Sequence, residues 1–194
     1  MESNQLNIDE LLAKKFVKDR SFSAGIKYKI ENGKIYFLVV TYRGQNWFFQ
    51  EKFPGGKSEN GGTPFEKGET PLETLEHEWS EETGRRIKKA KCIHHKILKD
   101  GHVQFFFLVE EDEEAGFPTK KDSDTELPRW ELATEALQNL YGQHKIACIK
   151  LIDKLLVEDT KFCNVAYMSN LINVLKKMKT KYRREHLYSP RPRV

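Results

Sequence analysis

The sequence predicts an α/β fold built on a mixed β-sheet with helices on both of its faces. Two pairs of β-rich runs support this prediction: Phe22 to Ile30 with Lys34 to Tyr42, and Cys92 to Leu98 with His102 to Val109. An Asn-Gly step separates the first pair and an Asp-Gly step the second, and both dipeptides favour hairpin turns. Helical patterns stand between and after the pairs, and this irregular alternation is typical of an α/β domain.

Further elements follow from local patterns along the chain. Asn7 offers a helix start, and a short leading helix is predicted with apolar positions at Ile8, Leu11, Leu12 and Phe16. Trp47 to Phe53 adds a third strand, and Ala133 to Leu140 and His144 to Val157 are predicted as helices. A last amphipathic helix has its apolar positions at Val165, Met168, Leu171, Ile172, Leu175 and Met178.

The length of 194 residues suits one globular domain with short additions at its ends. We expect a helical segment over residues 1–20, the main domain over 21–157, and a helix with a basic tail over 158–194. No run approaches the roughly 20 apolar residues of a membrane span. Met1 to Leu6 lacks the basic start and apolar stretch of a secretory signal, so a cytoplasmic protein is expected.

The charge distribution and the cysteines indicate which partners and which cellular compartment to expect. The net charge is +4, but the segment from Lys176 to Val194 alone carries +7, which leaves −3 for the rest. This tail is either a solvated terminus or a surface for RNA, whose phosphates clustered Lys and Arg contact in a salt-dependent way. Cys92, Cys148 and Cys163 are odd in number and widely spaced, which argues against a disulfide framework and favours a reducing compartment.

One helix is unusually well specified by its own residues. Thr70 is a suitable N-cap, Glu73 completes a capping box with it, and Gly84 supplies a C-terminal stop. With Pro71 at the first helical position, the helix should span Pro71 to Thr83. Its buried face is predicted at Leu72, Leu75 and Trp79.

Three carboxylates gather beside that face. Glu78, Glu81 and Glu82 stand at i, i+3 and i+4, so they share one exposed patch of the helix. Like charges at this spacing destabilise an isolated helix, and a hard divalent cation such as Mg²⁺ would compensate them. Taken alone, the three residues favour a solvated acidic face, which is common on surface helices.

The segment from Phe53 to Ile87 resembles the Nudix box, G-x5-E-x7-R-E-U-x-E-E-x-G-U, in which U is a bulky apolar residue. Gly56 takes the first position, Glu69 the next acid, and residues 77–84 the remainder. The chain departs from this pattern by a seven-residue insertion, Ser58 to Pro64, by His77 in place of arginine, and by Arg85 in place of the last apolar residue. The resemblance extends over roughly Phe22 to Val157.

The resemblance implies a Nudix-type α/β/α sandwich with a mixed β-sheet and a catalytic loop-helix-loop. It implies that Glu78, Glu81 and Glu82, with the backbone carbonyl of Gly56, bind Mg²⁺ or Mn²⁺ and that one of these glutamates, most often Glu78, acts as general base. The implied reaction is hydrolysis of a phosphoanhydride bond in a nucleoside diphosphate linked to another moiety. The rival interpretation is a Nudix-fold module that binds a nucleotide or a protein without hydrolysis, which His77 and the insertion favour.

Several weaker candidates remain open. Asp122, Asp124 or Glu126 supplies a further carboxylate or belongs to a solvated loop. His77 lies one helical turn from both Glu73 and Glu81 and is expected to brace the acidic face. Base stacking, phosphate contact or core packing would each suit the residues Tyr42, Arg43, Trp47 and Phe48.

Overall fold

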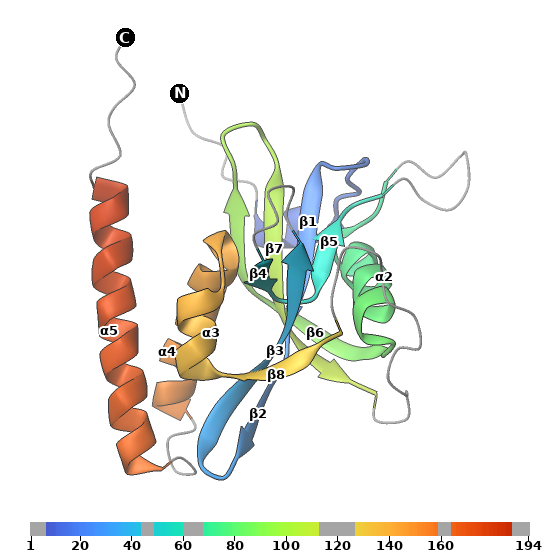
Figure 1. Cartoon of the computed structure of the whole chain (residues 1–194). Helices are drawn as coiled ribbons and strands as arrows, with labels where there is room; N and C mark the ends of the chain where they lie inside the picture. Colours follow the sequence, from blue (N-terminus) through green and yellow to red (C-terminus); the bar gives the residue numbers. More distant parts are fainter. Residues whose placement is uncertain (1–6, 44–48, 60–67, 113–126, 159–163, 188–194) are drawn as a thin grey trace.

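The computed structural model describes residues 7–43, 49–59, 68–112, 127–158 and 164–187 (Figure 1). Its helices are α1 (Ile8–Ala13), α2 (Pro71–Thr83), α3 (Ala133–Asn139), α4 (Gly142–Glu158) and α5 (Val165–Leu187). Its strands are β1 (Ser21–Ile26), β2 (Tyr28–Glu31), β3 (Lys34–Arg43), β4 (Phe49–Lys52), β5 (Gly55–Lys57), β6 (Ile87–Ile97), β7 (Val103–Glu111) and β8 (Arg129–Leu132). Among these helices, none combines the length and apolar character needed to cross a bilayer.

The strands form two sheets. The first has the order β5-β1-β7-β6 and is mixed, because β1 runs parallel to β7 and the other pairs are antiparallel. The second is antiparallel and joins β2, β3 and β4, with β8 added beside β3. The run from Phe22 to Ile30, predicted as one strand, therefore divides at Lys27 between the two sheets. The short strands β5 and β8 were not predicted.

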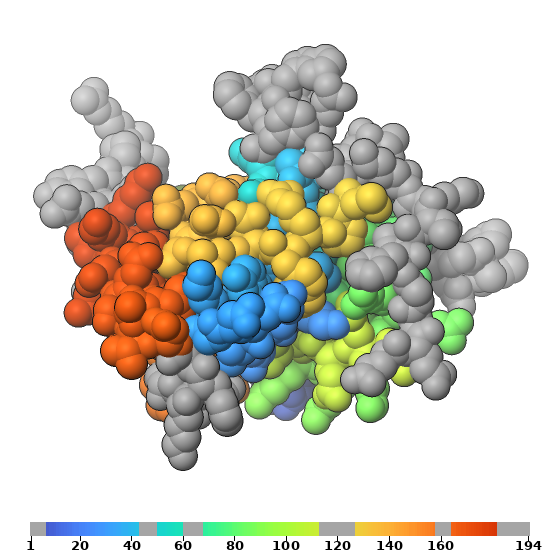
Figure 2. Space-filling model, turned by 60° about the horizontal axis from the view of Figure 1, so that its bottom comes forward, coloured from blue at the N-terminus to red at the C-terminus, as the bar shows by residue number. Residues whose placement is uncertain are grey.

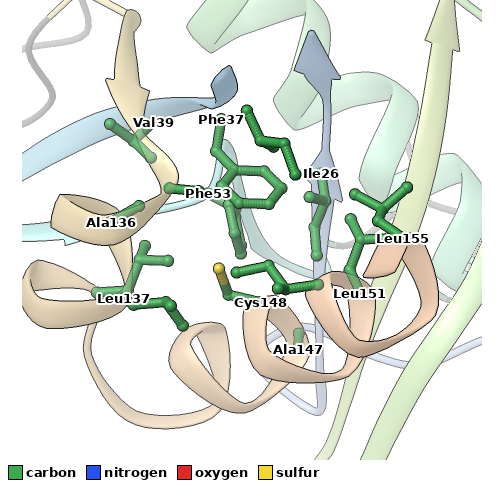
Figure 3. Packing of buried hydrophobic residues seen from close by; sticks show 14 of the residues in the cluster. Ile26, Phe37, Val39, Phe53, Ala136, Leu137, Ala147, Cys148, Leu151 and Leu155 are labelled. Carbon is green, nitrogen blue, oxygen red and sulfur yellow. The ribbon is translucent and has the colours of Figure 1, made fainter. Parts of the chain in front are cut away.

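Helices lie on both sides of the strands, so the predicted α/β/α arrangement is confirmed. In Figure 1, α2 lies on one side of the sheets, and α3, α4 and α5 lie on the other. The larger of two hydrophobic clusters unites Phe37 and Phe53 from the strands with Leu137 of α3 and Leu151 of α4, and Figure 3 shows these side chains facing one another. The smaller cluster holds Trp79 of α2.

The last helix is part of the same packing. Tyr167, Leu171 and Leu175 of α5 belong to the larger cluster, and the Tyr167 hydroxyl donates to the Ile35 carbonyl at 3.2 Å. The Asn164 N–H also donates to the Gly33 carbonyl at the tip of the β2–β3 hairpin. Figure 2 shows this hairpin, in blue, beside the orange surface of α5. The division of the chain at residues 20 and 157 stays a prediction.

The capping signals of α2 are confirmed. The helix spans Pro71–Thr83, the Thr70 side chain accepts from the Glu73 N–H, the Glu73 side chain accepts from the Thr70 N–H, and Gly84 ends the helix in the left-handed region at φ 67°. One part of its buried face was predicted wrongly. Leu72 is 41% exposed, whereas Thr74 is fully buried, and its hydroxyl is satisfied by donating to Glu69 Oε2 at 3.1 Å.

The leading helix is shorter than its apolar pattern. Asn7 caps α1 as expected, but the helix ends at Ala13. Phe16 instead forms an isolated antiparallel bridge with Glu69, each N–H donating to the other's carbonyl. The N-terminal segment is thereby attached to the residue that precedes α2.

A close approach joins α2 to β1. A Cβ added to Gly25 would lie 2.5 Å from two ring carbons of the fully buried Trp79. No side chain fits between the helix and the strand at this point, so glycine sets their separation.

A buried histidine stands at the start of α4. His144 is 3% exposed and lies edge-on to the rings of Phe22 and Phe106, with centroid distances of 5.4 and 5.0 Å. Its Nδ1 accepts the Phe53 N–H at 3.1 Å. Burial, with a smaller contribution from the charge of Lys52, lowers the pKa of His144 to about 3.

We predict that Gly25→Ala lowers the free energy of unfolding by about 1–3 kcal/mol, because the new methyl group overlaps the Trp79 ring. Urea unfolding of both proteins measures the change. The matched test is the same substitution in a Trp79→Leu background, where the methyl group should cost less. An equal cost in both backgrounds would show that the ring is not the obstacle.

We predict that His144→Asn flattens the acid branch of the stability profile. Above pH 6.5, neither folded nor unfolded His144 is protonated; as pH falls from there towards 3, only the unfolded chain gains the proton. The wild-type free energy of unfolding should therefore fall by up to ~1.4 kcal/mol per pH unit more than that of the variant, in which the asparagine oxygen still accepts the Phe53 N–H. Urea unfolding from pH ~7 to ~4 tests this, and equal slopes would contradict it.

Candidate active site

The candidate site begins where β5 meets the middle of α2. Gly56 lies so close to the Glu78 carboxylate that a Cβ added to the glycine would overlap it. Glycine therefore lets the carboxylate lie directly against the strand backbone. The structure thus brings together two of the four residues predicted to bind metal.

Glu82, a third member of that group, is held from two sides. Its Oε1 pairs with Lys52 Nζ at 2.8 Å, and its Oε2 accepts the Gly55 N–H at 2.7 Å. Lys52 Nζ also donates to the Gly55 carbonyl at 2.6 Å. Glu82 is 8% exposed, so the prediction that all three carboxylates share an exposed patch is wrong for this residue. Its burial is compensated by the paired lysine and the backbone donor.

Glu81, the fourth member, lies on the outer edge. Its carboxylate is 3.1 Å from His77 Nε2, and the other ring nitrogen of His77 is 3.6 Å from Glu69. His77 thus braces the acidic face as expected, but between Glu69 and Glu81. Glu73, the partner predicted from spacing, is occupied by the N-cap, where it accepts the Thr70 N–H at 2.7 Å.

The pKa of Glu78 reflects its burial and the negative charge of the neighbouring carboxylates. Burial, followed by the neighbouring charge of Glu82, raises the pKa of Glu78 to about 7, although Lys52 acts in the opposite direction. Glu81 contributes a further increase. A carboxylate under this repulsion is stabilised by any cation that reaches it.

The residues present suit a divalent cation, although the described side chains do not yet enclose one. In the described ranges, no three His, Cys, Asp or Glu side chains come together as a metal-binding group. The oxygen donors around Glu78 are nevertheless of the hard type that Mg²⁺ prefers. Each carboxylate oxygen of Glu82 has a second lone pair, so its bonds to Lys52 and Gly55 do not exclude it from a ligand set.

A cavity of about 600 Å³ adjoins this group, a size suited to a small-molecule ligand. Gly55, Gly56 and Lys57 belong to its lining, which connects it with the acidic site. The remaining lining residues are mostly aromatic or polar: Phe22, Tyr42, Lys52, Leu98, Gln104, Tyr141, Gly142, Gln143 and His144. Of the residues considered for base stacking, Tyr42 reaches the cavity; the side chains of Arg43, Trp47 and Phe48 lie outside the described part.

The insertion begins with a structural residue. Ser58 is 1% exposed and continues the pairing of β5 with β1, since its N–H donates to the Ser21 carbonyl and its Oγ accepts the Ser21 N–H at 3.1 Å. The loop excursion predicted from Ser58 therefore starts later in the chain. Residues 60–67 lie outside the described part, as do the candidate carboxylates Asp122, Asp124 and Glu126.

Arg85, the third departure from the box, forms an ion pair. Its guanidinium donates to Glu111 at 2.6 Å, and Lys27 pairs with the same carboxylate. This ion-pair group lies against the end of β7, so Arg85 joins α2 to the mixed sheet by charge. The basic tail beyond residue 181 has no described side chains, and RNA binding stays a prediction.

Sequence reasoning missed Lys52, Tyr141, Gln143 and His144. None of them belongs to the box, and each reaches the site through a contact between distant segments. The only local signal for Lys52 was its place between Glu51 and the apolar Phe53. In the structure this place is the end of β4, and Lys52 is buried there.

Comparison with known proteins identifies the fold. No protein-family model and no curated protein matches the chain. Solved structures do match: the NUDIX domain of Shewanella oneidensis NrtR in complex with ADP ribose is 12% identical, with a TM-score of 0.55 over 78% of this chain and 99% of that one. A Caenorhabditis elegans Ap4A hydrolase is 13% identical (TM-score 0.51, 70% and 98% covered), and a MutT NUDIX hydrolase from Burkholderia pseudomallei is 17% identical (0.50, 68% and 97%). The chain therefore has the Nudix fold.

Proposed function

We propose that the protein is a metal-dependent hydrolase that cleaves a phosphoanhydride bond in a nucleoside diphosphate linked to another moiety. The observation that carries this proposal is the apposition of Gly56 and Glu78, with Glu82 fixed beside them, next to a cavity of about 600 Å³ that Gly56 lines. The cavity supplies room for the nucleoside, and the acidic group beside it would hold the metal that binds the diphosphate. Of the proteins that share the fold, the NUDIX domain of NrtR was solved in complex with ADP ribose, and the Ap4A hydrolase was solved as a binary complex.

The residues of the site have three proposed roles: metal binding, contact with the phosphates and proton abstraction. Glu78, Glu81, Glu82 and the Gly56 carbonyl would hold Mg²⁺ or Mn²⁺, which when bound neutralises the diphosphate and makes water a better nucleophile. Lys57, exposed beside Gly56, offers a positive charge to the phosphates. Glu78 is the proposed general base, since it lies against Gly56 with no ion-pair partner of its own in the described residues. Attack at phosphorus would release a nucleotide and a second phosphorylated product.

Hydrolysis is favoured over binding without turnover. His77 and the insertion supported the binding interpretation, yet His77 still bridges two carboxylates and Ser58 is absorbed into the sheet. Neither departure displaces Gly56 or Glu78. A screen for phosphate or nucleotide release from dinucleoside polyphosphates, nucleotide sugars, nucleoside triphosphates and capped RNA, with and without Mg²⁺, tests the proposal. Absence of release from every substrate with Mg²⁺ or Mn²⁺ would refute it.

We predict that Glu78→Gln reduces turnover by about two orders of magnitude or more, because the amide can neither accept a proton nor supply the charge. The melting temperature should stay unchanged or rise, since repulsion from Glu82 and Glu81 is removed. Glu76→Gln, on an exposed part of the same helix, is the matched control and should retain full activity. Undiminished turnover of Glu78→Gln at saturating Mg²⁺ would rule out this assignment.

We predict that His77→Arg increases turnover severalfold at about pH 8, because a guanidinium stays charged at any working pH. Arginine also has donors enough to reach Glu69 and Glu81 together. His77→Gln serves as the comparison, because it keeps hydrogen bonding without charge. If His77→Arg is no faster than the wild type at this pH, His77 has a role of its own that arginine cannot fill.

A further inference from the structure

The first turn of α4 presents two polar side chains to the cavity, and hydrogen bonds behind them fix which atoms they offer. Gln143 and His144 both belong to the cavity lining. A side-chain amide or an imidazole can offer either a donor or an acceptor, so its other contacts decide what a ligand meets. Here those contacts decide for both residues.

His144 offers a donor. The Phe53 N–H donates to Nδ1 at 3.1 Å, so the proton of the neutral ring resides on Nε2. Because burial lowers the pKa of His144 to about 3, the imidazole ring is neutral at any pH near neutrality. Within the described residues no acceptor is found for the Nε2–H, so this donor is available to a ligand in the cavity that His144 lines.

Gln143 also offers a donor, through a relay of two residues. Lys150 Nζ lies 2.9 Å from His94 Nδ1, and since an ammonium group can only donate, Nδ1 is the acceptor. The His94 proton is therefore on Nε2, which donates to Gln143 Oε1 at 3.1 Å. The amino group of Gln143 is the part of the amide left for the cavity.

His94 is well placed to hold this orientation. It is 8% exposed, and its ring stacks on Phe106 with a centroid distance of 5.7 Å. Phe106 in turn lies edge-on to His144. Phe106 thus supports both donors, since it contacts His144 directly and also contacts His94, which holds Gln143.

The rest of the cavity suits a planar ring with a phosphate chain. Phe22, Tyr42 and Tyr141 supply aromatic surface, and Gly56 and Lys57 lead to the acidic site. Of the two purine bases, guanine carries two neighbouring acceptors, O6 and N7, on one edge, whereas adenine pairs the N7 acceptor with the 6-amino donor.

We propose that this cavity is a guanine subsite, in which Gln143 and His144 donate to the O6 and N7 edge and His94 positions Gln143. The inference rests on the proposed function, because the acidic site beside Gly56 is what places a nucleotide here. It adds the base that the substrate carries.

Binding of GMP and AMP in the presence of Mg²⁺ tests the proposal by isothermal titration calorimetry on the full chain. Neither nucleotide has a phosphoanhydride bond, so hydrolysis cannot interfere. GMP should bind at least about tenfold more tightly than AMP. Equal affinities, or no binding of either nucleotide, would overturn the proposal.

Gln143→Glu is the decisive variant. Its carboxylate still accepts from His94 but presents an acceptor to the cavity, so the GMP preference should disappear or reverse towards AMP. Repulsion of the phosphate affects both nucleotides alike and cancels in the ratio of Kd values. Gln138→Glu, the same change at an exposed position of α3, is the matched control and should keep the preference. An unchanged ratio in Gln143→Glu would overturn the proposal.

His94→Phe tests the positioning role. The substitution keeps a ring over Phe106 but removes the hydrogen bond to Gln143, so selectivity should fall severalfold while the melting temperature changes little. A retained ratio would remove His94 from the proposal. If GMP selectivity behaves as expected while no anhydride is cleaved, the guanine subsite stands and the hydrolase proposal fails. Cleavage without base selectivity would instead support the hydrolase and refute the guanine subsite.

Discussion

The close approach of α2 to the mixed sheet is the constraint on which the candidate site depends. Two glycines permit it, Gly25 under the Trp79 ring and Gly56 beside the Glu78 carboxylate. Glu82 then joins helix and strand by accepting the Gly55 N–H and pairing with Lys52. Because the contacts are short and mostly buried, the carboxylates are placed by the packing of the fold and not by the flexibility of their own side chains.

The segment from Lys52 to Lys57 connects the two halves of the site. Its glycines and Lys52 contact the acidic face of α2, and the same residues line the cavity that ends at Gln143 and His144. Phe53, between them, donates its N–H to His144 and places its ring in the main core. These six residues therefore contact both the carboxylates of α2 and the cavity.

Local signals in the sequence were reliable, and signals that depend on distant contacts were not. The capping box and glycine stop fixed α2 to the residue, because these interactions lie within a few positions of each other. Helical spacing alone could not show that Leu72 lies outside the packed region, or that Glu73 is engaged at the cap and leaves Glu69 to His77. The pair Lys52–Glu82 is separated by 30 positions, so no periodicity reports it.

The parallel pairing of β1 with β7 means that the mixed sheet can form only after most of the domain has been synthesised. Ser21 pairs with Val103, and the intervening chain includes the whole acidic helix and the β2–β3 hairpin. During synthesis from the N-terminus, β1 emerges long before its central partner exists and has only the three-residue β5 to pair with. The β6–β7 hairpin, by contrast, is local and carries its partner with it. The Gly56–Glu78 site therefore takes its final support from a strand that arrives after every one of its own residues has been made.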